Sequence, residues 1–242
     1  MSKTTKLTTG LLGLLVGALA ASAGAAVTME YKSDTYNAYT NRDVILNTDL
    51  ANQGQATVAS YSANADGGGF DNTEGGSDGA AAFCDGGAGG AYNTRGDAWG
   101  TSADVYFNLD SGTGGCAQGY NISQVRIFSG WPDDRGGTRF SVDYSVVGSA
   151  DWVTLYSYSP STRGTGQTLG NEFIIYNSVG GVNLISNCDA IRINMTPVAN
   201  SDYSLWLGTV YQEIDVLGTP VPEPASLGLL LLGGLALLRR RR

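Results

Sequence analysis

Apolar and polar residues alternate along eight short stretches in the middle of the chain. The alternation is clearest in residues 103–109, 122–128 and 140–146, which are separated by turn residues. A period of two places successive side chains on opposite faces of a strand, so each of these stretches is predicted to be a β-strand. Five further strands are predicted at residues 57–61, 152–157, 172–176, 190–195 and 210–217.

A helical pattern is missing from the body of the sequence, residues 27–218. No apolar set there recurs with sustained i, i+3, i+4 spacing, and Gly, Asp and Ser separate the predicted strands. Short strands joined by such turns are typical of an antiparallel sandwich or jelly roll, and sandwiches of about 190 residues commonly form one domain. The sequence therefore predicts an all-β fold, a single antiparallel β-sandwich. Residues 62–98 are rich in Gly and Asp, and we expect them to form an insertion over its surface.

The first 26 residues have the features of a secretory signal peptide. Lys3 and Lys6 precede an apolar stretch at 11–21, and Ala23-Gly24-Ala25 follows as a small-x-small cleavage pattern. This order is typical of Sec-dependent export, with cleavage that leaves a mature chain beginning near Val27. The alternatives are a buried helix and a retained anchor.

The last 24 residues form a second targeting segment. Val221-Pro222-Glu223-Pro224 precedes an apolar run at 225–238, and four arginines follow at 239–242. As a helix this run would span about 21 Å, less than the hydrocarbon core of about 30 Å, and the arginines favour the cytoplasmic side. Pro222 and Pro224 keep the preceding box extended, where a processing enzyme could read it.

These three elements, in this order, resemble the PEP-CTERM sorting signal. The resemblance implies that an exosortase-type membrane enzyme cleaves near the Pro-Glu-Pro box and passes the protein to the cell surface. It also implies a Gram-negative bacterium that makes exopolysaccharide, with the chain held in the inner membrane only transiently. An ordinary single-pass tail anchor is the alternative.

Composition and charge narrow the possible functions. The 242 residues include no histidine, which counts against a triad hydrolase or a zinc enzyme. The formal net charge is −8, and residues 27–220 hold 8 basic and 21 acidic residues. Such a body repels nucleic-acid phosphates and attracts divalent cations, so no nucleic-acid partner is expected.

Short motifs follow one another after residue 46, at residues 47–51, 56–60, 82–86, 99, 103–110, 122–127, 140–155, 190–193 and 212–218. In this order they resemble the discoidin or galactose-binding-like family, the jelly roll of coagulation-factor C-type domains and of many bacterial carbohydrate-binding modules. The sequence departs from that family in its long loop after Ser60 and in its hairpin, where Gly148-Ser149-Ala150-Asp151 replaces the usual D-G turn. The family's variable loops set its sugar or lipid ligands, so the resemblance implies a fold without naming a substrate.

The same resemblance implies a structural Ca²⁺ site. Asp85 lies in the segment similar to the family's A-x-x-D-G turn, and Glu213 lies in the closing strand. Carboxylates and backbone carbonyls are hard oxygen ligands that suit Ca²⁺. The alternative is that Asp85 caps a turn and Glu213 is solvated.

Two groups of aromatic and polar residues are candidate carbohydrate platforms. Trp131 follows a predicted strand and is close in sequence to Asp133, Asp134 and Arg135, and the second group contains Tyr203 and Trp206. A pyranose ring stacks on an exposed aromatic ring while carboxylates and guanidinium groups bind its hydroxyls. Trp131 could instead anchor its loop. The resemblance assigns Trp99 and Trp152 to core packing.

Three cysteines in an exported chain allow three single pairings: Cys84, Cys116 and Cys188. We expect Cys84 to pair with Cys116, because this bond would close a loop of 33 residues across the Gly-rich segment. In the chain-entropy model such a bond stabilises by about 3–4 kcal/mol. No histidine is present to activate a catalytic thiolate.

Together these features favour a non-enzymatic surface or extracellular-matrix protein that binds extracellular polysaccharide. Two alternatives remain open. One is a secreted polysaccharide-degrading enzyme, which would need two carboxylates about 5–10 Å apart in a cleft. The other is a structural coat protein without a ligand.

Overall fold

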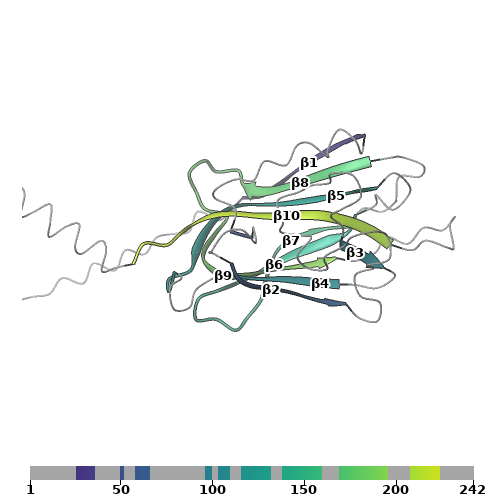
Figure 1. Ribbon diagram of the computed structural model, residues 1–242. Helices are drawn as coiled ribbons and strands as arrows, with labels where there is room; N and C mark the ends of the chain where they lie inside the picture. The colour runs from purple at the N-terminus through teal and green to yellow at the C-terminus, as the bar shows by residue number, and fades with distance from the viewer. Residues whose placement is uncertain are drawn as a thin grey trace, which may run out of the picture.

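The chain is all-β in the part that the computed structural model describes, with ten strands and no helix (Figure 1). The described residues are 26–35, 50–51, 58–65, 96–99, 103–109, 116–131, 138–159, 169–195 and 208–223. The strands are β1 (Val27–Thr35), β2 (Val58–Ala65), β3 (Gly96–Trp99), β4 (Ala103–Leu109), β5 (Tyr120–Trp131), β6 (Phe140–Val146), β7 (Val153–Tyr158), β8 (Leu169–Asn177), β9 (Ile185–Met195) and β10 (Gly208–Pro220).

All eight predicted strands are present, as β2 and β4 to β10. The sequence prediction missed β1 and β3. Strand β3 contains only four residues, and its first three, like the end of β2, lie inside the segment 62–98 that we expected to be an insertion. The sheet therefore takes up both ends of that segment.

The strands form two antiparallel layers. Hydrogen-bonded pairs place β1, β8, β5, β10 and β3 side by side in the first layer, and β7, β6, β9, β4 and β2 in the second (Figure 1). The layers are joined where the start of β5 pairs with β9, at Tyr120↔Cys188 and Ile122↔Ile185. The predicted antiparallel β-sandwich is thus confirmed.

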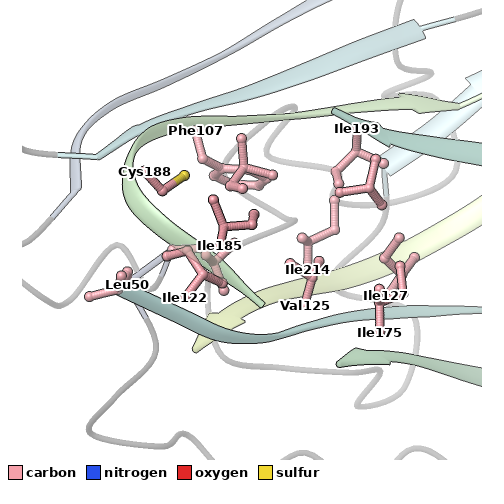
Figure 2. Close-up of a cluster of buried hydrophobic side chains, with 14 of the residues drawn as sticks. Leu50, Phe107, Ile122, Val125, Ile127, Ile175, Ile185, Cys188, Ile193 and Ile214 are labelled. Atoms are coloured by element: carbon pink, nitrogen blue, oxygen red, sulfur yellow. The ribbon is translucent and has the colours of Figure 1, made fainter. Parts of the chain in front are cut away.

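The hydrophobic core fills the space between the two layers (Figure 2). Phe107 and Ile193 point inward from the second layer and meet Val125 and Ile214 of the first, and all four are fully buried. Burying an aliphatic or aromatic side chain of this size stabilises the fold by about 1.5–3 kcal/mol. The alternation read from the sequence is therefore the alternation between this core and the outer faces.

The two ends of the sandwich differ in what they carry. We call one the loop end, where β5 finishes at Trp131 beside Leu169 of β8, and β9 finishes at Met195 beside Phe140 of β6. We call the other the tail end, where β1 begins and where β10 finishes at Pro220. Both ends of the described domain therefore lie at the tail end.

Candidate functional site

The predicted carbohydrate platforms belong to chain segments bounded by strand ends at the loop end. Trp131 is the last residue of β5, and Asp133, Asp134 and Arg135 come between β5 and β6. The second platform comes between Met195 of β9 and Gly208 of β10. Asp133, Asp134, Arg135, Tyr203 and Trp206 lie outside the described residues, as does the Trp131 side chain, so their roles stay predictions.

A buried polar network holds the base of the segment that contains Asp133. The hydroxyls of Ser129 and Thr138, on either side of that segment, are 2.6 Å apart, and the Asn171 amide donates to Ser129 Oγ at 3.4 Å. The Tyr211 hydroxyl donates to the carbonyl of Arg139 at 2.6 Å. Burial raises the pKa of Tyr211, so this donor stays protonated. The end of β5 and the start of β6 are thus held in place where the segment with the predicted platform leaves and rejoins the sheet. Precise placement of a binding loop requires such support.

A second polar and aromatic cluster lies on the outer face of the second layer. Its centre is Arg192 of β9, which pairs in register with Tyr106 of β4 and Asp143 of β6. The Arg192 guanidinium lies over the Trp152 ring at 4.8 Å, and Tyr106 meets the same ring edge-on with centroids 6.0 Å apart. The expectation that Trp152 packs in the core was wrong: it is half-buried on the outer face.

Asp143 holds the Arg192 side chain in this cluster. It accepts hydrogen bonds from Arg192 Nε (3.0 Å) and a terminal nitrogen (2.7 Å), and its other oxygen accepts from Thr154 Oγ1 (2.8 Å). Burial acts to lower the pKa of Arg192, but the bonds and charge of Asp143 outweigh it, so the pKa lies above its ordinary value. Arg192 is therefore a fixed cation that stacks on Trp152.

Sequence reasoning missed this cluster because Tyr106, Asp143 and Arg192 become neighbours only through the registers of β4 with β9 and of β9 with β6. The available signal was the position of Trp152, which follows the turn residues Gly148 and Ser149 and precedes β7. A large aromatic residue at the edge of a turn is less enclosed than one in the middle of a strand.

Two buried carboxylates on the outer face of the first layer both pair with Arg126, and Lys32 Nζ lies 3.7 Å from one of them, Glu172. Arg126 of β5 donates to Glu172 of β8 through Nε (3.1 Å) and through a second, shorter contact, and to Asp215 of β10 at 3.3 Å. The Glu172 and Asp215 side chains are only 4% and 6% exposed. Buried charges are stable only when paired, so these four residues form a structural ion-pair network.

One of the two predicted Ca²⁺ ligands can be placed. Glu213 lies in β10 opposite Phe128 of β5 and is fully buried, so the alternative that it is solvated was wrong. Its carboxylate has the oxygen chemistry that Ca²⁺ prefers. Asp85 lies outside the described residues, and among those described no three His, Cys, Asp or Glu residues gather as a metal site.

The two described cysteines, Cys116 and Cys188, are buried and form no disulfide with each other. Cys116 donates to the carbonyl of Val221 at 3.1 Å, and Cys188 donates to the carbonyl of Ala190 at 3.3 Å. Cys84 lies outside the described residues, so the pairing of Cys84 with Cys116 stays a prediction.

The predicted sorting box begins directly on the fold. The Val221 N–H donates to the Gly119 carbonyl at 2.9 Å, and the Val221 carbonyl accepts from Cys116. Pro222 and Glu223 are exposed, and residues from Pro224 onward lie outside the described part. Within the described part, no helix has the length and apolar character needed to cross a membrane.

In a comparison with protein families, residues 220–242 match the model of the PEP-CTERM protein-sorting motif. A comparison with curated proteins found no match. Among solved structures, the chain is similar to chitosan-binding module 1 from a chitosanase/glucanase of Paenibacillus sp. IK-5, with 16% identity, 70% of this chain and 98% of that chain covered, and a TM-score of 0.39. It is also similar to CBM32-3 from a family 31 glycoside hydrolase of Clostridium perfringens (14% identity, 67% and 90% covered, TM-score 0.40).

A third similar structure is an F5/8 type C domain from Bacteroides fragilis, with 12% identity, 67% of this chain and 93% of that chain covered, and a TM-score of 0.38. The motif at residues 220–242 indicates an exported protein with a C-terminal sorting signal.

Proposed function

We propose that this chain is a non-enzymatic surface or extracellular-matrix protein of a Gram-negative bacterium, and that its loop end binds extracellular polysaccharide. The observation that carries the proposal is the arrangement of the two ends. The predicted platforms are bounded by strand ends at the loop end, whereas the sorting box leaves from Pro220 at the tail end. A domain tethered through Pro220 directs its loop end away from the membrane.

The chemistry of the loop end suits a sugar. Trp131 offers an indole on which a pyranose ring can stack, and Asp133, Asp134 and Arg135 offer carboxylate and guanidinium partners for hydroxyls. The network of Ser129 and Thr138 fixes the root of this loop, which lowers the entropy lost on binding.

Affinity electrophoresis of the exported protein in gels that contain different polysaccharides tests the proposal. We expect one polysaccharide to retard the wild type, and Trp131→Ala to abolish this retardation. Val179→Ala is the control, because Val179 is 45% exposed in the turn between β8 and β9 at the tail end. Unchanged retardation of the Trp131 variant would remove the platform, and new reducing ends in the polysaccharide would favour the enzyme instead.

We also propose that the chain is held only transiently in the inner membrane, where an exosortase-type enzyme cleaves it near the sorting box. Pro222 and Glu223 are exposed immediately after the fold, where such an enzyme can reach them. We expect Glu223→Ala to leave the uncleaved chain in the inner-membrane fraction, while the wild type reaches the surface with a shortened C-terminus measurable by mass spectrometry. The same mature mass for both proteins would contradict this route.

We also propose that Glu213 and Asp85 bind a structural Ca²⁺. Because Glu213 is wholly buried, a cation beside it would offset the cost of burying its charge. We expect EDTA to lower the melting temperature of the wild type and to have little effect on Glu213→Gln. Equal melting temperatures of the wild type with EDTA and with Ca²⁺ would remove the site.

A further inference from the structure

A pocket of about 300 Å³ opens on the outer face of the second layer, toward the tail end. Its floor is one row of registered residues across three strands, where Ala190 of β9 lies between Asn108 of β4 and Ser145 of β6. Because the Ala190 side chain is small, the middle of this row is recessed relative to its two ends. The other lining residues in the described part are Leu109, Ser149, Ala150, Trp152 and Asp189.

The Trp152 ring forms one wall of the pocket, and two neighbouring side chains fix its orientation. Arg192 lies over the indole at 4.8 Å, and Tyr106 contacts it edge-on at 6.0 Å. These contacts occupy one part of a half-buried ring, and another part lines the pocket. An aromatic side chain held in this way loses little freedom when a ligand packs against it.

The polar groups of the pocket suit the hydroxyls of a ligand without negative charge. The Ser145 hydroxyl donates to Asp189 Oδ1, so the Asp189 carboxylate is held at the pocket. Neither Lys nor Arg is among the lining residues in the described part of the chain, and the nearby Arg192 is bound by Asp143. The Asp189 carboxylate at the pocket would repel an anionic sugar.

We propose that this pocket is a second carbohydrate subsite, which takes one uncharged pyranose residue of a polysaccharide chain. The inference rests on the proposed function, because it assumes that the protein binds polysaccharide. A volume near 300 Å³ lies at the lower end of the range of about 300–1,000 Å³ typical of small-molecule pockets, which fits a single sugar unit. The pyranose stacks on Trp152, and Asp189 and Asn108 bind its hydroxyls.

The test compares variants of the exported protein by affinity electrophoresis in neutral glucan, galactan, mannan and xylan, with alginate as the anionic probe. Trp152→Ala removes the aromatic wall. Ala190→Ile fills the floor with a residue that suits a strand and keeps Trp152 in place. Val182→Ile is the matched control, because Val182 is 44% exposed in the turn between β8 and β9, outside the pocket. Circular dichroism melts check that each variant is folded.

We expect both pocket variants to weaken binding of one neutral polysaccharide by about tenfold or more, and the control to match the wild type. Unchanged binding of Ala190→Ile overturns the inference, whatever Trp152→Ala does. If Trp131→Ala loses binding while both pocket variants keep it, the subsite is wrong and the proposed function survives. Retardation of the wild type by alginate alone overturns the choice of an uncharged sugar, and no retardation by any polysaccharide overturns both proposals.

Discussion

Replacing Asp143 by Asn tests whether the ion pair with Arg192 stabilises the outer face of the second layer. The substitution keeps the size of the side chain and removes its charge. Asp143 accepts hydrogen bonds from Arg192 Nε at 3.0 Å, from a terminal Arg192 nitrogen at 2.7 Å and from Thr154 at 2.8 Å. Asn can still accept at its one oxygen, but its amide group adds donors that face the guanidinium.

The size of the effect follows from burial. The Asp143 and Arg192 side chains are 8% and 27% exposed, so the pair is only partly screened by water. Hydrogen bonds to charged groups contribute about 1.5–3 kcal/mol, and breaking a fully buried pair costs about 3–5 kcal/mol. Arg192 also interacts with the charge of Asp104, which keeps part of its stabilisation. We therefore expect Asp143→Asn to lower the free energy of unfolding by about 2 kcal/mol, which corresponds to a fall in melting temperature of about 4–8 °C.

Urea unfolding followed by circular dichroism measures this loss. A double-mutant cycle with Arg192→Met, which keeps most of the aliphatic stem, isolates the pairwise term, and we expect a coupling free energy of about 1–2 kcal/mol. A loss of stability below about 0.5 kcal/mol for Asp143→Asn, the range of ordinary surface substitutions, would refute the reasoning. A coupling free energy of zero would do the same.

Two other predictions concern positive φ angles and alkaline pH. Gly119 has φ 74°, and a Cβ there would lie 2.6 Å from the Cys188 carbonyl oxygen, whereas Gly148 has φ 82° and nothing within 4 Å of a Cβ. In urea unfolding, Gly148→Ala should cost about 1–2 kcal/mol and Gly119→Ala clearly more, and equal costs would contradict the contact. Burial, followed by the charge of Asp189, raises the pKa of the Cys188 thiol from 9.0 to about 12. The unfolded thiol ionises first, so stability should fall between these two pKa values by up to about 1.4 kcal/mol per pH unit. In urea unfolding at a series of pH values, the free energy of unfolding of Cys188→Ala should fall less steeply over this range than that of the wild type. Parallel curves of unfolding free energy against pH for the two proteins would exclude the effect.

The alternating pattern was enough to predict the layers of the fold, because one face of each strand packs into a single core. Strand β3 escaped prediction because Gly96 to Trp99 has no alternation, and its extended form comes from pairing with β10, more than 100 residues later in the sequence. Such pairing is a tertiary effect that overrides weak local preference.

The pocket was beyond prediction for a related reason. Asn108, Ala190 and Ser145 become neighbours only through the registers of β4 with β9 and of β9 with β6. Shifting either register by one residue would turn a different row of side chains outward. Sequence alone identified Trp152 as a large aromatic residue, and the structure was needed to place it beside that row.

The position of Pro220 determines how the domain would resist mechanical force. Pro220 ends β10, and β10 runs antiparallel to β5, whose far end is Trp131. If a ligand held near Trp131 is pulled away while the C-terminal tail stays anchored, the tension acts along both strands in opposite directions. The backbone hydrogen bonds between β5 and β10 are then loaded in shear, all at the same time, and are not broken one after another from one end of the strands.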